Sequence, residues 1–467
     1  MTDVLVIGGG PAGTPLAMAL AQAGRKVTLV EAGPGLGGTC LFEGCIPSKI
    51  FRETARRLRE LRAADTFGLC LPTQDAKVNW SAVLARKRAI LKRRGETALA
   101  RAGRIPTLEV VKGHARLLSP RSAEITLPND QRRTISFEQA VIATGSIPVR
   151  PPIPGVDHAR VLDSEDILDI GEIPQRLVII GGGPIGVELG QVFRTLGSEV
   201  ALLEAAPHIL GPVDPELAQI LTDRMQNDGI EITTGCQIKA IVNTGGDGVY
   251  VEYTASARGE RRRFADTVLL VTGRRPRVEG LGLEQTGVTH GPHGIEVNAE
   301  LETAEPGIFA VGDVIGQPMF AHWATAQGLA LARHMRGLPS QFPLAEHNSA
   351  VIFSEPEIGM AGLTEAQARE RGIAVGIARY DFAQDARAQI AAHDDGMLKI
   401  VYDKESRRVV GVHALVEGAG EIMGEAALLV RAGIPIEALA NSIHPHPTLT
   451  ESFGLAARMA LASDPNH

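Results

Sequence analysis

The chain has 467 residues, of which 44% are hydrophobic and 4% aromatic, and its net charge is −7 at pH 7. This length predicts about three domains with several hydrophobic cores. The negative balance argues against a nucleic-acid or anionic-membrane partner, and four cysteines are too few for a disulfide scaffold.

The first predicted strand, over residues 4–7, begins almost at Met1 and leaves no room for a secretory leader. No apolar run approaches the ~18 residues that a membrane helix needs. We therefore expect a cytoplasmic protein with no membrane partner.

This strand runs into a glycine turn and then into a helix that ends near Gly24. Gly8, Gly10 and Gly13 match the G-x-G-x-x-G spacing of a dinucleotide-binding unit. The first glycine permits the turn, the second lets the backbone approach a pyrophosphate, and the third lets helix and strand pack closely. Glu31 ends the next predicted strand, where an acid accepts hydrogen bonds from ribose hydroxyls.

Cys40 and Cys45 follow this unit, in the run 37–49, about one helical turn apart. Two thiols at such spacing can close into a disulfide and, beside a bound dinucleotide, pass two electrons between a redox cofactor and an outside thiol. A metal site is disfavoured because no second Cys or His pair lies nearby at ligand spacing, and a purely structural pair is the remaining alternative. Cys70 and Cys236 have no partner pattern, and we expect both to be inert buried thiols.

The glycine pattern then recurs. A strand over 177–180 leads into Gly181, Gly183 and Gly186, and Glu204 follows Gly183 by the same 21 residues that separate Glu31 from Gly10. One such pattern can be purely structural, whereas two complete units, each with its acid, predict that the chain binds two dinucleotides.

The later elements complete these units and add a different one. A Pro-rich linker is predicted over 147–154, a charged turn-rich stretch over 254–266, a return strand that closes at Gly273, and a buried strand that ends at Gly312-Asp313. Beyond Pro343, alternating runs and a helix near 421–432 predict an antiparallel sheet with covering helices. The alternating runs cover 397–402 and 409–415.

In this order the motifs resemble those of the pyridine nucleotide-disulfide oxidoreductases, and most closely the dihydrolipoamide dehydrogenases among them. The resemblance runs from about Val4 to Ser452. Its motifs are the first glycine turn, the run 40–49, Ala143-Thr144-Gly145, the second glycine turn through Glu188, Gly312-Asp313 and the run His444 to Glu451.

The resemblance implies an α/β fold with two Rossmann-like dinucleotide-binding domains and a C-terminal α+β dimerisation domain. It implies an FAD-binding domain over 1–148 and 274–343, an NAD-binding domain over 149–273, and an interface domain over 344–467. The cofactors would be FAD and NAD. The protein would be a homodimer in which each active site combines two subunits.

The resemblance also implies roles for single residues. Cys45 would be the thiol that faces the flavin, and Cys40 the thiol that exchanges with substrate. His446 fits the base that this exchange needs, with Glu451 to hold its other ring nitrogen, although a lone histidine is more often structural. His444 fits a packing or supporting role better.

Lys49 and Glu188 resemble a pair at the flavin's N5 edge, although either charge could be an ordinary surface group. Asp313 resembles the acid that holds the ribityl chain, and its alternative is a turn-forming aspartate. The other residues assigned to cofactor binding are the glycines and acids of the two turns together with Thr144, Gly145 and Gly273.

Glu204 favours NAD over NADP, because a carboxylate repels a 2′-phosphate. The predicted reaction is therefore the oxidation of protein-bound dihydrolipoyl dithiols with NAD⁺, through the cysteine pair and the His–Glu base. The partner would be a lipoyl-bearing carrier protein. A related flavin disulfide or quinone reductase is one alternative, and a non-catalytic dinucleotide-binding redox sensor is another.

Three features depart from the family's usual pattern. Glu43 stands between the cysteines, where its charge is expected to raise the pKa of Cys40, and by the resemblance Pro184 would lie beside the nicotinamide site. The helix after Lys49 is unusually basic over 51–59. It is either a solvated face with local ion pairs or a surface for an acidic lipoyl carrier.

Overall fold

The computed structural model describes residues 1–70, 76–256 and 259–463, and the chain divides into two units. The first unit comprises Met1–Pro151, Leu162–Glu172 and Thr272–Pro343. The second comprises Pro152–Val161, Ile173–Val271 and Leu344–His467. The finer division into FAD, NAD, central and interface parts stays a prediction.

The first unit is built on a seven-stranded sheet whose centre is parallel. The parallel pairing of β1 with β2 and β6 places Val4 opposite Val27 and Gln139. β1 is apolar and buried along almost its whole length, as a strand covered on both faces must be. In sheet order the strands are β3 (Leu108–Lys112), β2 (Val27–Glu31), β1 (Thr2–Ile7), β6 (Arg132–Ile142), β5 (Ser122–Thr126) and β4 (His114–Ser119), with β19 (Ile308–Ala310) also beside β6.

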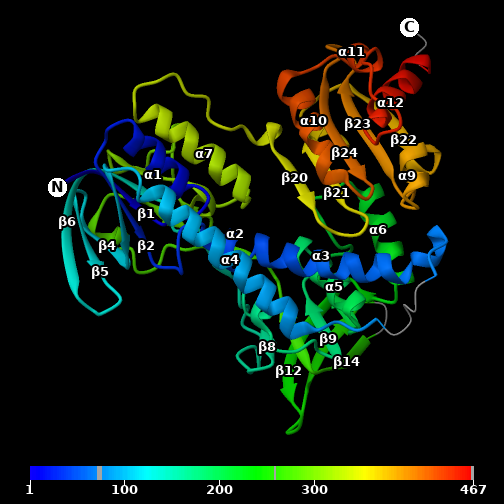
Figure 1. Ribbon diagram of the computed structural model, residues 1–467, viewed down its shortest axis with the longest axis horizontal. Helices are drawn as coiled ribbons and strands as arrows, with labels where there is room; N and C mark the ends of the chain where they lie inside the picture. The colour runs from blue at the N-terminus through cyan, green and yellow to red at the C-terminus, as the bar shows by residue number, and fades with distance from the viewer. Residues whose placement is uncertain (71–75, 257–258, 464–467) are drawn as a thin grey trace. The chain divides into compact units, whose positions relative to one another are not determined.

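Helices α1 (Gly13–Gln22) and α7 (Ala321–His334) pack against each other beside this sheet (Figure 1). The helix α1 buries Leu16, Ala17 and Leu20, and Gly24, at φ 89°, ends its last turn. A short helix α2 (Gly38–Phe42) precedes two long helices, α3 (Cys45–Arg62) and α4 (Trp80–Ala102), which contact each other.

The chain leaves and re-enters the first unit through a two-stranded antiparallel ribbon. In it, β7 (Ser146–Pro148) pairs with β16 (Arg274–Pro276). The predicted linker over 147–154 therefore begins inside a strand. A second small ribbon joins β17 (His290–Gly291) to β18 (Gly294–Ile295).

The second unit contains a second sheet with a parallel centre and an antiparallel ribbon. The parallel sheet has the order β11 (Glu231–Thr233), β10 (Glu199–Leu203), β9 (Arg176–Ile180), β15 (Thr267–Leu270) and β8 (Val161–Leu162), with helices α5 (Pro184–Leu196) and α6 (Pro215–Asn227). The ribbon is β12 (Cys236–Asn243), β13 (Val249–Ala255) and β14 (Gly259–Ala265). The expectation of turns over 254–266 is thus wrong for 259–265, because charged side chains also suit a solvated edge strand.

The predicted C-terminal antiparallel sheet is confirmed. Its order is β20 (Ser349–Ile352), β21 (Ile358–Gly362), β24 (Val409–Leu415), β23 (Met397–Asp403) and β22 (Val375–Asp381). The long helices α10 (Ala419–Ala432) and α12 (Glu451–Ala462) pack on it, and the short helices are α8 (Glu365–Glu370), α9 (Ala386–Ile390) and α11 (Ile436–Ala440).

Buried polar groups join this sheet to the parallel sheet of the same unit. The side-chain amide of Gln191, on α5, donates to the backbone carbonyl of Glu355 at 2.8 Å and accepts from its backbone N–H at 2.9 Å. Lys399, on β23, has a side chain only 3% exposed and donates to Asp214 at 2.8 Å, Glu216 at 3.0 Å and Glu365 at 2.9 Å. The three carboxylates use all three donors of one ammonium group.

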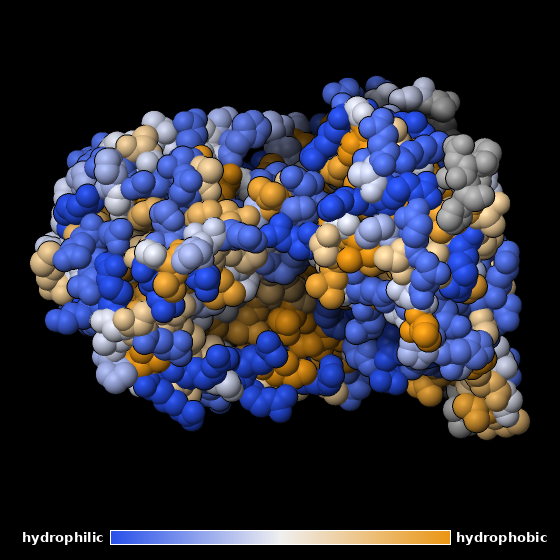
Figure 2. All heavy atoms as spheres, turned by 90° about the horizontal axis from the view of Figure 1, so that it is seen from above, coloured by the Kyte–Doolittle hydropathy of each residue, from blue (hydrophilic) through white to orange (hydrophobic). Residues whose placement is uncertain are grey.

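The face shown in Figure 2 is largely hydrophilic, with patches of hydrophobic residues. Within the described ranges, no helix combines the length and the apolar character needed to cross a bilayer. Large exposed hydrophobic side chains occur in the C-terminal part of the second unit, among them Ile443 at 98%, Leu428 at 70% and Met459 at 51% exposure.

Candidate active site

The first glycine turn has the geometry that a dinucleotide pyrophosphate requires. Gly8 adopts φ 106°, and a Cβ there would lie 2.2 Å from the carbonyl oxygen of Ala143. A Cβ on Gly13 would lie 1.9 Å from the carbonyl oxygen of Gly8. A Cβ on Gly10, in contrast, would meet nothing closer than Gly38, at 3.9 Å. The outer glycines thus permit the turn and the helix packing, and Gly10 leaves open space for a ligand.

Glu31 closes this turn from the end of β2. Its carboxylate accepts the backbone N–H of Gly9 at 2.6 Å and that of Gly33 at 2.5 Å. The predicted ribose acid therefore also has a structural role, because it ties the glycine turn to the loop after the strand.

The second turn repeats this construction. Gly181 adopts φ 117°, a Cβ on Gly186 would lie 2.1 Å from the carbonyl oxygen of Gly181, and a Cβ on Gly183 would meet no atom within 4 Å. Glu204 accepts the backbone N–H of Gly182 at 2.5 Å and that of Ala206 at 2.6 Å. Both turns therefore fit the dinucleotides predicted for them.

Asp313 lies in the turn after β19 and is held by a side-chain network. Ser146 donates from Oγ to Asp313 Oδ2 at 2.7 Å and accepts from Nε of Arg274 at 2.8 Å. The guanidinium of Arg274 also donates to the backbone carbonyl of Ser146 and to Glu165, both at 2.9 Å. The buried amide of Gln327 accepts the backbone N–H of Gly312 at 2.8 Å.

The loop of Thr144 and Gly145 is fixed by the same ribbon. Thr144 Oγ1 donates to the carbonyl oxygen of Arg277 at 2.7 Å, and the backbone N–H of Arg277 donates to the carbonyl oxygen of Gly145 at 2.9 Å. Gly145 and Gly273 both adopt positive φ, and a Cβ on either would meet no atom within 4 Å. These positions are open to a ligand, and their assignment to cofactor binding stays a prediction.

The two cysteines lie at a break between helices and not on one helical turn. Cys40 belongs to α2 and Cys45 begins α3, because Gly44 between them adopts a non-helical φ of −153° and ψ of −101°. A hydrogen bond between the two thiol groups is the main factor that raises the pKa of Cys40, and burial raises it further, while Lys49 and Arg94 lower it. Cys45 is exposed and Cys40 half-buried, so the pair is in contact and reachable from outside.

Glu43 interacts with groups other than the thiols. Burial raises the pKa of its carboxyl, the Glu165 carboxylate raises it further, and Arg277 and Arg274 lower it. The charges that act most strongly on Cys40 are those of Cys45, Lys49 and Arg94. The pKa of Cys40 is raised, as expected, but its largest causes are the hydrogen bond with Cys45 and burial and not the charge of Glu43.

The structure brings His446 and Glu451 together. His446 Nδ1 lies 2.9 Å from Glu451 Oε1, and its side chain is 73% exposed. The backbone N–H of Thr448 also donates to Glu451 at 2.8 Å, and this bond and the one to His446 lower the pKa of the Glu451 carboxyl. His446 thus has one ring nitrogen held by a carboxylate and the other turned away from that bond, as a base requires.

His444 instead makes a supporting contact, as predicted. Its Nε2 lies 2.9 Å from Glu425 Oε1 on α10, which fixes the loop before α12 to that helix.

Lys49 and Glu188 lie in different units, so their predicted pairing stays a prediction. Lys49 is on the first turns of α3, close enough to Cys40 to lower its pKa. Glu188, on α5, accepts the backbone N–H of Phe353 at 2.9 Å.

The other two cysteines differ from each other. Cys236 is buried, which raises its pKa, whereas Cys70 is exposed. The expectation of a buried Cys70 is wrong. This residue comes after the end of α3 and after the short 3₁₀ turn that ends at Phe67, where the side chain is exposed. Within residues 1–70, 76–256 and 259–463, no three His, Cys, Asp or Glu side chains are arranged to hold a metal ion. The expected absence of a metal site stays a prediction.

Comparison with known proteins places these features in one family. Residues 2–328 match the family described as pyridine nucleotide-disulphide oxidoreductase, and residues 348–457 match its dimerisation domain. The chain belongs to the pyridine nucleotide-disulphide oxidoreductases.

Named relatives in this family are dihydrolipoyl dehydrogenases. The chain is 36% identical to one from Geobacillus stearothermophilus over 466 residues, which cover 99% of this chain and 97% of the relative. It is 37% identical to one from Thermus scotoductus over 462 residues, which cover 97% and 96%.

Two solved structures have a similar fold. The Cu(II) complex of RclA from Escherichia coli, an HOCl-induced flavoprotein disulfide reductase, has a TM-score of 0.87 at 27% identity and covers 98% of this chain and 99% of its own. LpdA from Mycobacterium tuberculosis has a TM-score of 0.90 at 25% identity with the same coverage. The predicted family, fold class and enzymatic nature are confirmed, as are FAD and NAD as the cofactors of this kind of oxidoreductase.

Sequence reasoning missed Ser146 and Arg274, which hold Asp313. Ser146 follows directly on Thr144-Gly145, and Arg274 follows Gly273, so both flank predicted cofactor residues. Their position next to predicted cofactor-binding residues was the only feature in the sequence that could have indicated their role.

Proposed function

We propose that this pyridine nucleotide-disulphide oxidoreductase oxidises protein-bound dihydrolipoyl dithiols and passes the electrons to NAD⁺. The observation that carries the proposal is the contact between Cys40 and Cys45 at the α2–α3 break. Cys40 lies in the same short helix as Gly38, which borders the first glycine turn. Gly38 of α2 lies 3.9 Å from where a Cβ of Gly10 would stand, so the dithiol segment borders the space for the first dinucleotide.

The sulfur steps balance within the proposed reaction. A substrate thiolate attacks Cys40 of the oxidised pair, the Cys40–Cys45 bond breaks, and Cys45 leaves as a thiolate. The second substrate thiolate then attacks the substrate sulfur bonded to Cys40, which releases the cyclic disulfide. His446 accepts the substrate proton at Nε2 while Glu451 holds Nδ1. In sum, dithiol and NAD⁺ give disulfide, NADH and one proton.

In the reduced pair, the hydrogen bond with Cys45 and burial raise the pKa of Cys40 and favour its protonated thiol, whereas the cations of Lys49 and Arg94 act against this rise. The chemistry that bound FAD supplies is two-electron transfer between this pair and NAD. Gly10, Asp313 and the Thr144-Gly145 loop would hold it.

The second dinucleotide would be NAD rather than NADP. Glu204 places a carboxylate at the end of β10, beside the second glycine turn, where a 2′-phosphate would be repelled. The test is the ratio of kcat/KM for NADH and NADPH, and equal values would contradict this role of Glu204.

The working form would be a homodimer in the cytoplasm. The match to the dimerisation domain supports the dimer, and the exposed Ile443 and Leu428 offer apolar surface for it. The chain's low cysteine count supports a reducing compartment.

A second candidate is the reduction of another disulfide or a quinone by NADH, which the likeness to the disulfide reductase RclA favours. The two differ in which pair of reactants turns over. NAD⁺ reduction by dihydrolipoamide should exceed NADH oxidation by glutathione disulfide, quinones or Cu(II) if the first proposal holds.

The decisive variants are Cys45→Ser and His446→Gln. Cys45→Ser should abolish dithiol oxidation and retain FAD, and loss of FAD instead would mean that the pair is structural. His446→Gln should slow dithiol oxidation by about two to four orders of magnitude, the range for a positioned acid–base group. His393→Gln, at an exposed histidine of the same unit, is the control. Normal physiological behaviour of cells that carry Cys45→Ser would revive the redox-sensor alternative.

A further inference from the structure

Positive charge is concentrated on α4 and the turn after it. Residues 80–104 contain eight Lys or Arg and one acid, Glu96, for a net charge of +7, whereas the whole chain has −7. The remaining residues therefore carry −7 − 7 = −14. Lys87 is buried and pairs with Asp169, and the other seven cations are exposed. These are Arg86, Arg88, Lys92, Arg93, Arg94, Arg101 and Arg104.

The neighbouring helix α3, which looked more basic in the sequence, neutralises much of its charge. Arg56 and Arg57 both pair with Glu53 and Glu60, and these arginines lower the pKa of the Glu53 carboxyl to about 2. The interpretation of α3 as a solvated face with local ion pairs is therefore the better one. On α4, of the seven exposed cations, Lys92 alone has a carboxylate within 4.0 Å in the part of the chain that the structure describes.

Four of the α4 arginines share one side of the helix. At about 100° per residue, Arg86, Arg93, Arg94 and Arg101 fall within an arc of roughly 100°. They extend over about 22 Å of helix axis, at about 1.5 Å per residue. We call these four residues the α4 basic face. Such a row of like charges repels itself, so an anionic partner that lies along it would relieve that repulsion.

The helix that carries the α4 basic face also packs the dithiol segment, and Arg94 is the member of the face closest to it by its effect on Cys40. Leu41 of α2, Ile50 of α3 and Leu91 of α4 form one buried apolar cluster, which packs the cysteine segment on α4. Phe42 packs on Gly95, where a Cβ would lie 3.0 Å from its ring. The adjacent Arg94 is close enough to Cys40 to lower its pKa.

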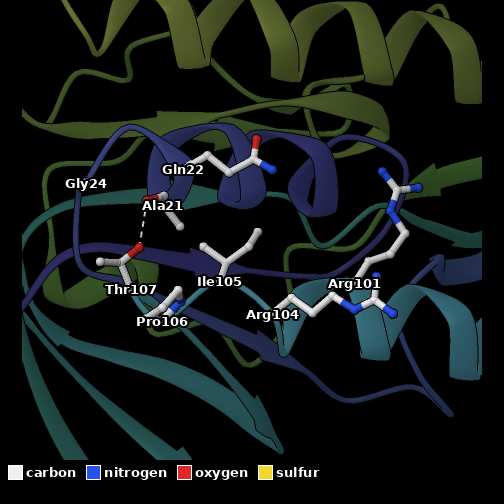
Figure 3. A pocket seen from close by; sticks show the side chains of 8 residues that line it. All are labelled: Ala21, Gln22, Gly24, Arg101, Arg104, Ile105, Pro106 and Thr107. Atoms are coloured by element: carbon white, nitrogen blue, oxygen red, sulfur yellow. Dashed lines mark hydrogen bonds between the residues drawn. The ribbon is translucent and has the colours of Figure 1, made fainter.

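The C-terminal end of α4 also borders a recess. An open groove of about 590 Å³ lies between the ends of α1 and α4, with Arg101 and Arg104 on its wall (Figure 3). Gln22 lies on the α1 side of the groove, and Thr107 donates its hydroxyl to the carbonyl oxygen of Ala21. None of the predicted site residues lines this groove. It continues the basic face away from the cysteines.

We infer that the α4 basic face is the surface on which an acidic lipoyl-bearing carrier protein docks to present its dithiol to Cys40. This inference rests on the proposed function. Charge complementarity selects an acidic partner, and the closeness of Arg94 to Cys40 favours one that delivers sulfur. A nucleic acid or an anionic membrane would match the charge but carries no thiol or disulfide that could react with the neighbouring cysteines.

The test uses the full-length holoenzyme with three exposed arginines neutralised together, Arg86→Gln, Arg93→Gln and Arg101→Gln. Arg94 is kept because it acts on Cys40. The control neutralises three exposed arginines on other elements, Arg132→Gln, Arg261→Gln and Arg336→Gln, with the same change in net charge. The substrates are free dihydrolipoamide, a dihydrolipoylated acidic carrier domain, and that domain with its surface acids changed to amides.

The triple variant should lose about 10-fold or more in kcat/KM for the acidic carrier at low ionic strength, because charge steering raises association rates by about 10- to 10³-fold. The loss should disappear in about 0.5 M salt and should not occur with the amidated carrier or free dihydrolipoamide. The control variant should behave as the native enzyme does.

Three results would overturn the inference. The first is a triple variant that matches the control with the acidic carrier. The second is an equal loss with free dihydrolipoamide, which would mean a damaged dithiol site. The third is binding of duplex DNA or anionic vesicles that the triple substitution abolishes while carrier turnover is kept. Failure of the native enzyme to oxidise free dihydrolipoamide would instead contradict the proposed function itself.

Discussion

At the scale of single residues, Ser146 links a cation to the acid predicted to hold the flavin. Its hydroxyl donates to Asp313 and accepts from Arg274, and Arg274 is in turn held by Glu165. The side chain of Arg274 is 16% exposed, so water competes little for these bonds. Arg274 is therefore a positioning residue for Asp313.

Arg274→Met should weaken FAD binding about 10- to 100-fold, because it removes charge-assisted bonds of about 1.5–3 kcal/mol and leaves the Ser146 hydroxyl free to turn from Asp313. The measurement is titration of the apoprotein with FAD by flavin fluorescence. Arg275→Met is the control, since this neighbour pairs with the exposed Glu279 and faces away from the network. Equal affinities of the two variants would contradict the role of Arg274.

At the scale of single residues, the sequence predicted those site residues that belong to short local motifs. The glycine turns, Glu31, Glu204 and the His446–Glu451 pair were identified from fixed spacings, and the structure shows the predicted contact of His446 with Glu451. The bonds of Glu31 and Glu204 to main-chain amides were not predicted. Arg274 and Ser146 escaped because 128 positions separate them in the chain, so that only the folded ribbon brings them together.

At the scale of elements, Lys399 fastens β23 to the start of α6. Asp214 is buried, accepts from Lys399 and also caps α6 by accepting the backbone N–H of Glu216 at 3.0 Å. Removing the cation would leave this carboxylate buried without a charge partner.

Lys399→Met should therefore lower the free energy of unfolding by about 3–5 kcal/mol, the usual effect of breaking a buried pair from one side. Urea unfolding followed by circular dichroism measures it. Lys404→Met, at an exposed lysine just after the same strand, should change stability by less than about 0.5 kcal/mol. A comparable loss in both variants would show that the cluster adds nothing specific.

The same cluster predicts an acid-sensitive stability. Arg379 foremost, with Lys399, lowers the pKa of the Glu216 carboxyl from 4.5 to about 2, and Arg369 and Lys399 lower that of Glu365. Because the folded pKa lies below the ordinary value, this stabilisation is complete above pH 4.5 and is lost as the pH falls toward about 2. The urea midpoint should decline over this window, and Glu216→Gln should flatten the decline. Parallel curves for variant and native protein would argue against the cluster as its source.

Element prediction succeeded where hydrophobic period and length agreed. The strands 397–402 and 409–415 and the helix near 421–432 are confirmed by β23, β24 and α10. It failed at β14, whose arginines suggested turns, because its stability comes from pairing with β13 and from ion pairs of Arg263 with Glu199 and Glu231. The residues of β14 by themselves reveal neither its pairing with β13 nor the glutamates that pair with Arg263.

At the scale of the whole molecule, we expect a second copy to bind over exposed apolar side chains of the matched dimerisation domain. The His444–Glu425 bond holds the loop that carries Ile443 against α10, and Leu428 follows Glu425 by one turn on that helix. Ile443 and Leu428 therefore lie near each other, and Ile443 comes three residues before His446 in the chain.

Ile443→Asp with Leu428→Asp should weaken the homodimer, because buried apolar surface would be replaced by two desolvated charges. Analytical ultracentrifugation should show monomer at concentrations where the native chain is dimeric. Ile390→Asp, at a 66% exposed position on α9, is the control and should stay dimeric. A double variant that sediments as the native protein does would place the dimer contact elsewhere.

The carboxylates that close the two glycine turns have a consequence for the emptied protein. Since Glu31 and Glu204 bond to main-chain amides of their own loops, each turn keeps its shape without help from a nucleotide. Removal of FAD should thus leave the first glycine turn in the conformation that binds it, so that rebinding costs little conformational entropy in this turn. The enzyme could then be emptied and refilled without passing through unfolding.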